Sequence, residues 1–175
     1  ADRQPAQREA LVRTNLLESG RALAEMLSIW SNDRRDWGGY ADDNGFVEAG
    51  RRLAAAGNGL IIALPHLGNW ELMAYLATRI APATALYRPS RLQVMDELMR
   101  RGRQRSGITP VPTDRQGLKA LHGSLRRGEI VGILPDQVPK SGGASGVVAP
   151  FFGHPALTMT LISRLARRHG SAVLF

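Results

Sequence analysis

Two short apolar runs, at positions 60–64 and 130–134, constrain the fold of this chain more than any other feature of its sequence. Each run is five residues long and has no polar side chain, so neither face of it is suited to water. Strands that are apolar on both faces are typical of parallel sheets covered by helices on both sides. The two runs therefore predict buried strands inside an α/β domain.

The segments around these runs alternate between helical and extended patterns. Strands are expected at 60–64, 83–87, 108–111, 130–134 and 172–175, and helices at 45–56, 68–79, 92–106, 116–127 and 156–168. This alternation predicts an α/β fold with a largely parallel central sheet flanked by helices. The turn-rich stretches 31–44 and 138–146 predict loops.

Residues 5–30 predict a separate N-terminal amphipathic helix, because leucines recur along it at helical spacing. Such a basic helix either packs on its own domain or lies on a membrane surface. We therefore divide the chain into an N-terminal helix and loop at 1–44 and an α/β core at 45–175. Since no helix follows the last expected strand, we expect the core to be truncated at its C-terminus.

The balance of charge narrows the possible partners without selecting one. Twenty-three Lys and Arg against 15 Asp and Glu give a net charge of +8. This excess indicates either a solvated basic surface or an anionic partner, such as nucleic acid, phospholipid head groups or an acidic protein. The absence of cysteine excludes a thiolate nucleophile, and the four histidines show no paired metal spacing.

His66 follows the first apolar run, at the carboxyl end of a predicted strand, where ligands and catalytic groups gather in α/β sheets. Glu71 lies five residues later, in the first turn of the next predicted helix. A carboxylate that accepts one ring proton leaves the other imidazole nitrogen basic, so this pair could deprotonate a hydroxyl. The alternative is a histidine at a strand end and a glutamate paired with a nearby arginine.

The His-x4-Glu pattern after a buried strand resembles the His-x4-Asp/Glu motif of the glycerolipid acyltransferase superfamily. Three other segments agree with it in order and rough spacing: Tyr-Arg-Pro at 87–89, Leu-Pro-Asp-Gln at 134–137, and Pro-Phe-Phe-Gly at 150–153 followed by Ala-Leu-Thr at 156–158. Together they resemble one branch, the lipid A biosynthesis lauroyl/myristoyl acyltransferases with the related mannoside acyltransferases of mycobacteria. The resemblance covers about residues 50–175.

The resemblance implies a role for each motif residue. His66 would be the general base, and Glu71 would orient it. Arg88 would bind an anionic group of a substrate, and Tyr87 would either contact the substrate or only pack. Asp136 would shape the site or contact the acceptor, but it stands in Leu-Pro-Asp-Gln where the superfamily has Phe-Pro-Glu-Gly, so structural support is an open alternative.

The resemblance also implies a reaction and its partners. A fatty acyl chain would move from the thioester of acyl carrier protein or coenzyme A to a hydroxyl of a lipid A precursor, or of another glycolipid or lysolipid, without a cofactor. The enzyme would lie peripherally on the cytoplasmic face of the inner membrane, against an anionic membrane surface, with no specific nucleic acid.

The arginines of the expected helix at 92–106 would offer a docking face for the acidic carrier protein or for lipid phosphates, unless they form only a solvated face. They are Arg100, Arg101, Arg103 and Arg105. The competing hypothesis is a non-catalytic basic module that binds nucleic acid or membrane, and only the net charge supports it.

Overall fold

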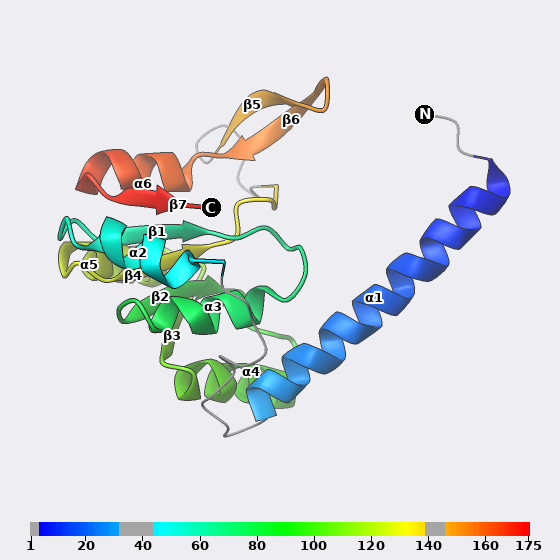
Figure 1. Cartoon of the computed structure of the whole chain (residues 1–175), viewed down its shortest axis with the longest axis horizontal. Helices are drawn as coiled ribbons and strands as arrows, with labels where there is room; N and C mark the ends of the chain where they lie inside the picture. The colour runs from blue at the N-terminus through cyan, green and yellow to red at the C-terminus, as the bar shows by residue number, and fades with distance from the viewer. Residues whose placement is uncertain (1–3, 32–43, 139–145) are drawn as a thin grey trace.

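The computed structural model describes residues 4–31, 44–138 and 146–175, and its centre is a parallel sheet (Figure 1). The sheet contains β1 (Leu60–Ala63), β2 (Ala83–Tyr87), β3 (Ile108–Pro112), β4 (Ile130–Ile133) and β7 (Ala172–Leu174). Their order is β3-β2-β4-β1-β7, and every neighbouring pair runs parallel. The predicted α/β fold and parallel sheet are confirmed.

Helices cover both faces of this sheet, as the two apolar runs predicted. The helices of the core are α2 (Phe46–Ala54), α3 (Trp70–Thr78), α4 (Gln93–Arg105), α5 (Arg115–Arg126) and α6 (Leu161–His169). In β1, Leu60 and Ile62 face the cluster that includes residues of α2 and α3, whereas Ile61 faces the cluster built from α5 and α6. All three side chains are buried. Each contributes about 2 kcal/mol of hydrophobic stabilisation.

One expected helix is wrong over its first five residues. Residues 146–159 form an antiparallel hairpin of β5 (Gly146–Phe151) and β6 (His154–Met159), so the helix expected at 156–168 begins only at Leu161. The hairpin closes on Phe152 and Gly153, whose φ angles are +49° and +79°. Positive φ at both central residues matches the turn that fits the twist of paired strands. A non-glycine residue in this conformation is uncommon, so the sequence carried little signal for it.

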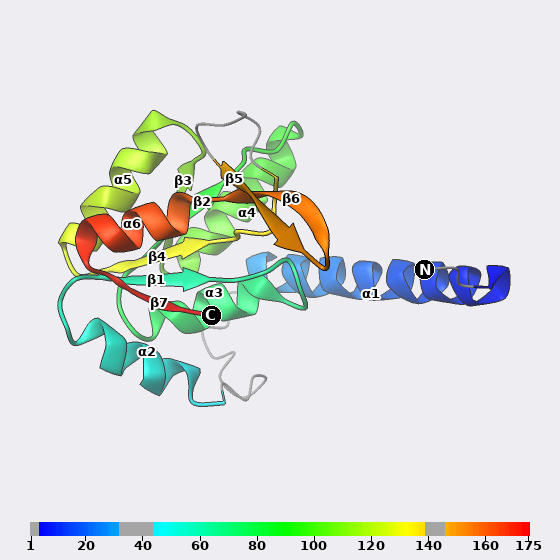
Figure 2. The ribbon, with the colours of Figure 1, turned by 90° about the horizontal axis from the view of Figure 1, so that it is seen from above.

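The hairpin and the N-terminal helix both extend beyond the sheet on the side to which its strands point (Figures 1 and 2). The predicted N-terminal helix is confirmed as α1 (Pro5–Ser31). Its C-terminal end packs on the core, where Ile29 and Trp30 are buried, while leucines in its N-terminal half are largely exposed. Within the described residues, no helix has the length and apolarity to cross a bilayer.

The two expected loops cannot be compared with the structure over most of their length. Residues 32–43 and 139–145 lie outside the described residues. At their borders, Asn44 and Gly45 form a turn before α2, and Gly146 already belongs to β5.

Candidate active site

Two polar side chains lie level with each other where strands β1 and β4 end. The strands are neighbours, and Ala63 at the end of β1 pairs with Ile133 at the end of β4. His66 comes three residues after Ala63, and Asp136 comes three residues after Ile133. The parallel register therefore brings together residues that are 70 positions apart in the sequence.

Two hydrogen bonds join His66 to Asp136. The ring Nδ1 of His66 lies 2.7 Å from Oδ1 of Asp136, and the backbone N–H of His66 donates to Oδ2 at 2.6 Å. An ionised carboxylate only accepts hydrogen bonds, so Nδ1 carries the proton. Both side chains are partly open to solvent, with 34% and 37% of their surface exposed. The carboxylate thus fixes both the tautomer and the orientation of the ring.

Asp136 is held in its charged form by these contacts. Partial burial acts to raise the pKa of Asp136, but the hydrogen bonds from the backbone and ring of His66 outweigh it and hold the pKa below its usual value. Charge-assisted hydrogen bonds of this kind are stronger than neutral ones. The carboxylate is therefore available to stabilise a positive charge that develops on His66.

The second ring nitrogen of His66 is left as the basic atom of the pair. Gln137 places its Nε2 3.4 Å from Nε2 of His66, and Trp70 sets its ring edge against the imidazole with centroids 5.0 Å apart. A neutral imidazole whose Nδ1–H is bound to a carboxylate can accept a proton at Nε2. The arrangement is suited to general-base chemistry on a hydroxyl.

Glu71 has a different partner from the one expected. It lies in the first turn of α3, after the cap residue Asn69, whose side chain accepts from the Leu72 N–H at 3.2 Å. The Glu71 carboxylate is 2% exposed and binds Arg103 of α4, whose Nε lies 3.1 Å from each carboxylate oxygen and whose Nη2 also donates to it. The structure thus brings His66 together with Asp136, and Glu71 together with Arg103.

Arg88 and Tyr87 lie at the same edge of the sheet as the His66–Asp136 pair. Tyr87 is the last residue of β2 and is half-buried, and Arg88 follows it and is exposed. Strand β2 pairs with β4, with Ala85 opposite Gly132, so Arg88 is nearly level with Asp136 one strand away. The strand order β2-β4-β1 therefore sets Arg88, Asp136 and His66 along one edge.

The arginines of α4 are less available than expected. Arg100 and Arg101 both bind Glu97 of the same helix, and Arg103 binds Glu71. Arg105, the last residue of α4, is exposed. Arg100, Arg101 and Arg103 are thus already paired with carboxylates of this chain.

A small apolar cavity lies beside the Glu71–Arg103 pair. It has a volume of about 40 Å³, and Trp70, Leu86 and Leu134 are among its lining residues. A space of this size holds about one water molecule, so it is closed to a long acyl chain in this conformation. Within the described residues, no group of three or more His, Asp and Glu side chains could hold a metal ion.

The sequence model of the bacterial lipid A biosynthesis acyltransferases matches residues 1–175. The chain belongs to this family. The family resemblance drawn from the motifs is therefore confirmed, and the His66–Asp136 pair lies within the matched region.

Two relatives within the family give the extent of the likeness. A lipid A biosynthesis palmitoleoyltransferase of Escherichia coli (strain K12) is 31% identical over 175 residues, which cover 96% of this chain and 54% of the relative. A lipid A biosynthesis lauroyltransferase of the same organism is 29% identical over 169 residues, with the same coverage. The chain spans about half the length of these curated relatives.

Proposed function

We propose that this chain carries the catalytic site of an O-acyltransferase of lipid A biosynthesis. The acyl donor is the thioester of an acyl carrier protein or of coenzyme A, and the acceptor is a hydroxyl of a lipid A precursor. The observation that carries the proposal is the hydrogen-bonded pair of His66 and Asp136 at the carboxyl edge of the sheet, in a chain of this family.

The pair accounts for the proton movements of the reaction. Nε2 of His66 takes the proton of the acceptor hydroxyl while the oxygen attacks the thioester carbon, and Asp136 stabilises the imidazolium that forms. The tetrahedral oxyanion is stabilised by backbone N–H groups at the start of α3. When it collapses, the C–S bond breaks and His66 returns its proton to the leaving thiolate. Asp136 thus has the orienting role that the resemblance implied for Glu71.

Arg88 supplies a positive charge for an anionic group of a substrate. It is exposed at the same edge of the sheet as His66, and it has no ion-pair partner among the described residues. Guanidinium groups bind phosphate with paired hydrogen bonds, so Arg88 is suited to a phosphate group of the acceptor or the donor.

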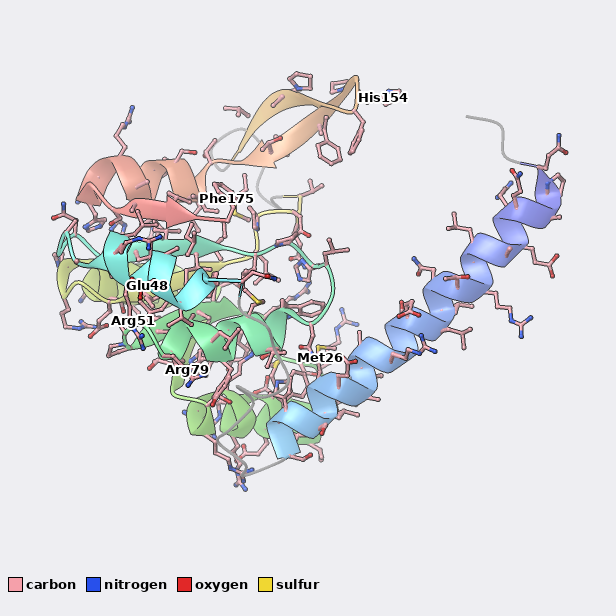
Figure 3. All side chains as sticks on the ribbon, in the orientation of Figure 1. Met26, Glu48, Arg51, Arg79, His154 and Phe175 are labelled. Carbon is pink, nitrogen blue, oxygen red and sulfur yellow. The ribbon has the colours of Figure 1, made fainter. Side chains whose placement is uncertain are left out.

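We place the site against the anionic cytoplasmic surface of the inner membrane, with peripheral contact. Large apolar side chains are exposed in the segments that follow three strands of the sheet: Leu67 after β1, Leu92 and Val94 after β2, and Val138 after β4. Phe152 of the hairpin turn adds another apolar side chain and is 88% exposed. Figure 3 labels His154, which lies at the same end of the hairpin. Exposed apolar clusters of this kind mark interaction sites, and a lipid acceptor resides in a membrane.

Acyl transfer with single variants tests the pair. The protein is incubated with lauroyl-acyl carrier protein and a lipid A precursor, and the acylated lipid is quantified. We expect His66→Ala to lower kcat by at least about 100-fold, the usual contribution of a general base, and Asp136→Asn to lower it substantially. Asp136→Asn removes the charge that stabilises the imidazolium while keeping the shape of the side chain.

A carboxylate on the surface provides the matched control. Glu48→Gln removes one negative charge from α2, where Glu48 makes an exposed ion pair with Arg52 at 3.8 Å. Its kcat should stay within twofold of the parent value. Wild-type turnover by a folded His66→Ala protein would rule out His66 as the base.

A further inference from the structure

A second cavity lies on the opposite face of the sheet from α3, between α5 and α6. Its volume is about 680 Å³. Leu118 and Leu161 belong to its apolar lining, and Leu86 of β2 lines both this cavity and the small one beside Glu71. No residue of the His66–Asp136 pair takes part in it, so it is separate from the candidate active site.

A pair of histidines stands at this cavity. His122 of α5 lines it, and its Nδ1 lies 2.7 Å from Nε2 of His169 at the end of α6. One ring nitrogen of the two must donate and the other accept, so the bond exists only while at least one ring is neutral. Sequence patterns alone do not predict this contact, because 47 residues separate the two histidines.

Positive charge surrounds the histidine pair. Burial lowers the pKa of His122 and of His169. The charge of His169 lowers the pKa of His122 further, and Arg168 and Arg126 act in the same direction on both rings, with Arg164 also acting on His122. Arg164, Arg167 and Arg168 line the cavity. Several cations close to histidines whose pKa values are lowered form an electropositive site.

Little negative charge offsets these cations. Asp114 is the sole carboxylate among the described residues that line the cavity, and its side chain accepts the Gly117 N–H at the start of α5, at 2.9 Å. Neither Arg167 nor Arg168 has an ion-pair partner in the part of the chain that the structure describes. The cavity therefore combines an apolar lining with unneutralised guanidinium groups.

We propose that this cavity binds a phosphate group carried on an apolar chain, with Arg168 and the His122–His169 pair as its recognition elements. Arg168 donates to the phosphate oxygens, and the anion stabilises a protonated histidine. The apolar lining accommodates the carbon chain. This inference is independent of the proposed acyltransferase reaction, because none of these residues takes part in it.

Nuclear magnetic resonance of the histidine rings tests the proposal at pH 6.5 and constant ionic strength. We expect inorganic phosphate to shift the His122 and His169 ring signals in a saturable way and to raise the pKa of at least one of them. Dihexanoyl phosphatidic acid should bind at least roughly tenfold more tightly, because its short chains cover the apolar lining. Dihexanoyl phosphatidylcholine, which has the same chains without net charge, should not compete with it.

Two variants that each lose one arginine charge distinguish binding at this cavity from a general attraction of phosphate to a basic protein. Arg168→Gln should weaken phosphate binding by about tenfold, the loss expected for one charge-assisted contact. Arg13→Gln, on an exposed turn of α1, should leave it unchanged. Circular dichroism checks that both variants are folded.

Four results would overturn the proposal. The first is that phosphate causes no saturable shift of the His122 or His169 ring signals in the parent protein, and the second is that it shifts the exposed His154 equally. The third is that the two variants bind phosphate with equal affinity, and the fourth is that the phosphatidylcholine competes with the phosphatidic acid. Equal affinity for inorganic phosphate and for the phosphatidic acid would show that the apolar chain does not contribute to binding. The cavity would then be a site for free phosphate.

Discussion

The carboxylates of Glu71 and Asp136 lie in different surroundings, which give them different tasks. Asp136 is partly exposed and contacts His66 through both of its oxygens. Glu71 is buried and contacts a guanidinium that is itself only 15% exposed. A buried ion pair fixes the positions of the two elements that carry it, here α3 and α4, and removing one partner leaves an uncompensated charge.

Glu71→Gln should therefore act on stability rather than on the imidazole. We expect the free energy of unfolding, measured by urea denaturation, to fall by about 3 kcal/mol. This is the lower end of the range for a broken buried pair, because Arg103 keeps some contact with solvent. Asp136→Asn should cost less stability, because the Asp136 side chain is only partly buried. The kcat of a folded Glu71→Gln protein should stay closer to the parent value than that of Asp136→Asn.

A double variant provides the control for this prediction. Replacing both partners, as Glu71→Leu with Arg103→Met, removes the buried charges together and should recover much of the lost stability. A loss in the double variant as large as the sum of the two single losses would show that the residues do not act as a pair.

At the scale of elements, α1 is attached to the core through one close contact with α4. A Cβ placed on Gly102 would lie 2.5 Å from both Cα and Cβ of Trp30, closer than real contacts allow. Asn69 adds a hydrogen bond from its side chain to Glu25 of α1, at 3.0 Å. The helix is thus joined both to α4 and to the cap of α3, directly after the loop that carries His66.

Gly102→Ala tests this attachment. Alanine would favour the helix by about 1 kcal/mol, but overpacking against the backbone of Trp30 costs about 1–3 kcal/mol, and the second effect should win. We expect lower stability and faster tryptic cleavage within α1, because the helix has to move away from α4. Cleavage rates are followed by mass spectrometry.

Gly20→Ala is the matched control for this change. It makes the same substitution inside α1, at a position where a new Cβ meets nothing within 4 Å. It should raise stability slightly and leave the cleavage rate of α1 the same or lower. A Gly102→Ala protein as stable and as resistant as Gly20→Ala would contradict the close contact.

The helices and strands that were predicted well are those whose secondary structure follows from their own sequence pattern. The run 60–64 is apolar at every position and formed a buried strand, and Asn69 capped the following helix as its side chain allows. The hairpin was missed because it depends on a left-handed Phe152. His66 was placed correctly at a strand end, but its partner depends on which strands are neighbours. The β1–β4 register that selects Asp136 is a tertiary property, which strand patterns alone do not reveal.

At the scale of the whole molecule, part of the excess positive charge lies in a place that the sequence did not suggest. The arginines of α4 were expected to form a docking face or a solvated face, but Arg100 and Arg101 bind Glu97, and Arg103 binds Glu71. Arg167 and Arg168 of α6, by contrast, have no such partner among the described residues. Sequence spacing can show the two Glu97 pairs, which are three and four residues apart, but not the Arg103–Glu71 pair, because Glu71 comes from another helix.

Folding stability depends on pH through the two half-buried histidines, His122 and His169. Burial, and then the neighbouring arginines, lower the pKa of His122 and His169 in the folded protein below the value of about 6.5 in an unfolded chain. Below pH 6.5 the unfolded chain therefore binds more protons than the folded one. Their contribution to stability is fully present above pH 6.5 and is lost as the pH falls towards the folded pKa values.

Urea unfolding at several pH values between 7.5 and 5 measures this effect. The double variant His122→Asn with His169→Gln keeps polar groups near the positions of Nδ1 and Nε2 but cannot titrate, so it should lose less stability over this range than the parent protein. His154→Gln, on the exposed hairpin, should follow the parent curve. Asp136 and Glu129, whose pKa values are lowered, lose their contributions only at more acidic pH. Identical pH dependence in the parent and the double variant would show that folding does not lower the pKa values of His122 and His169.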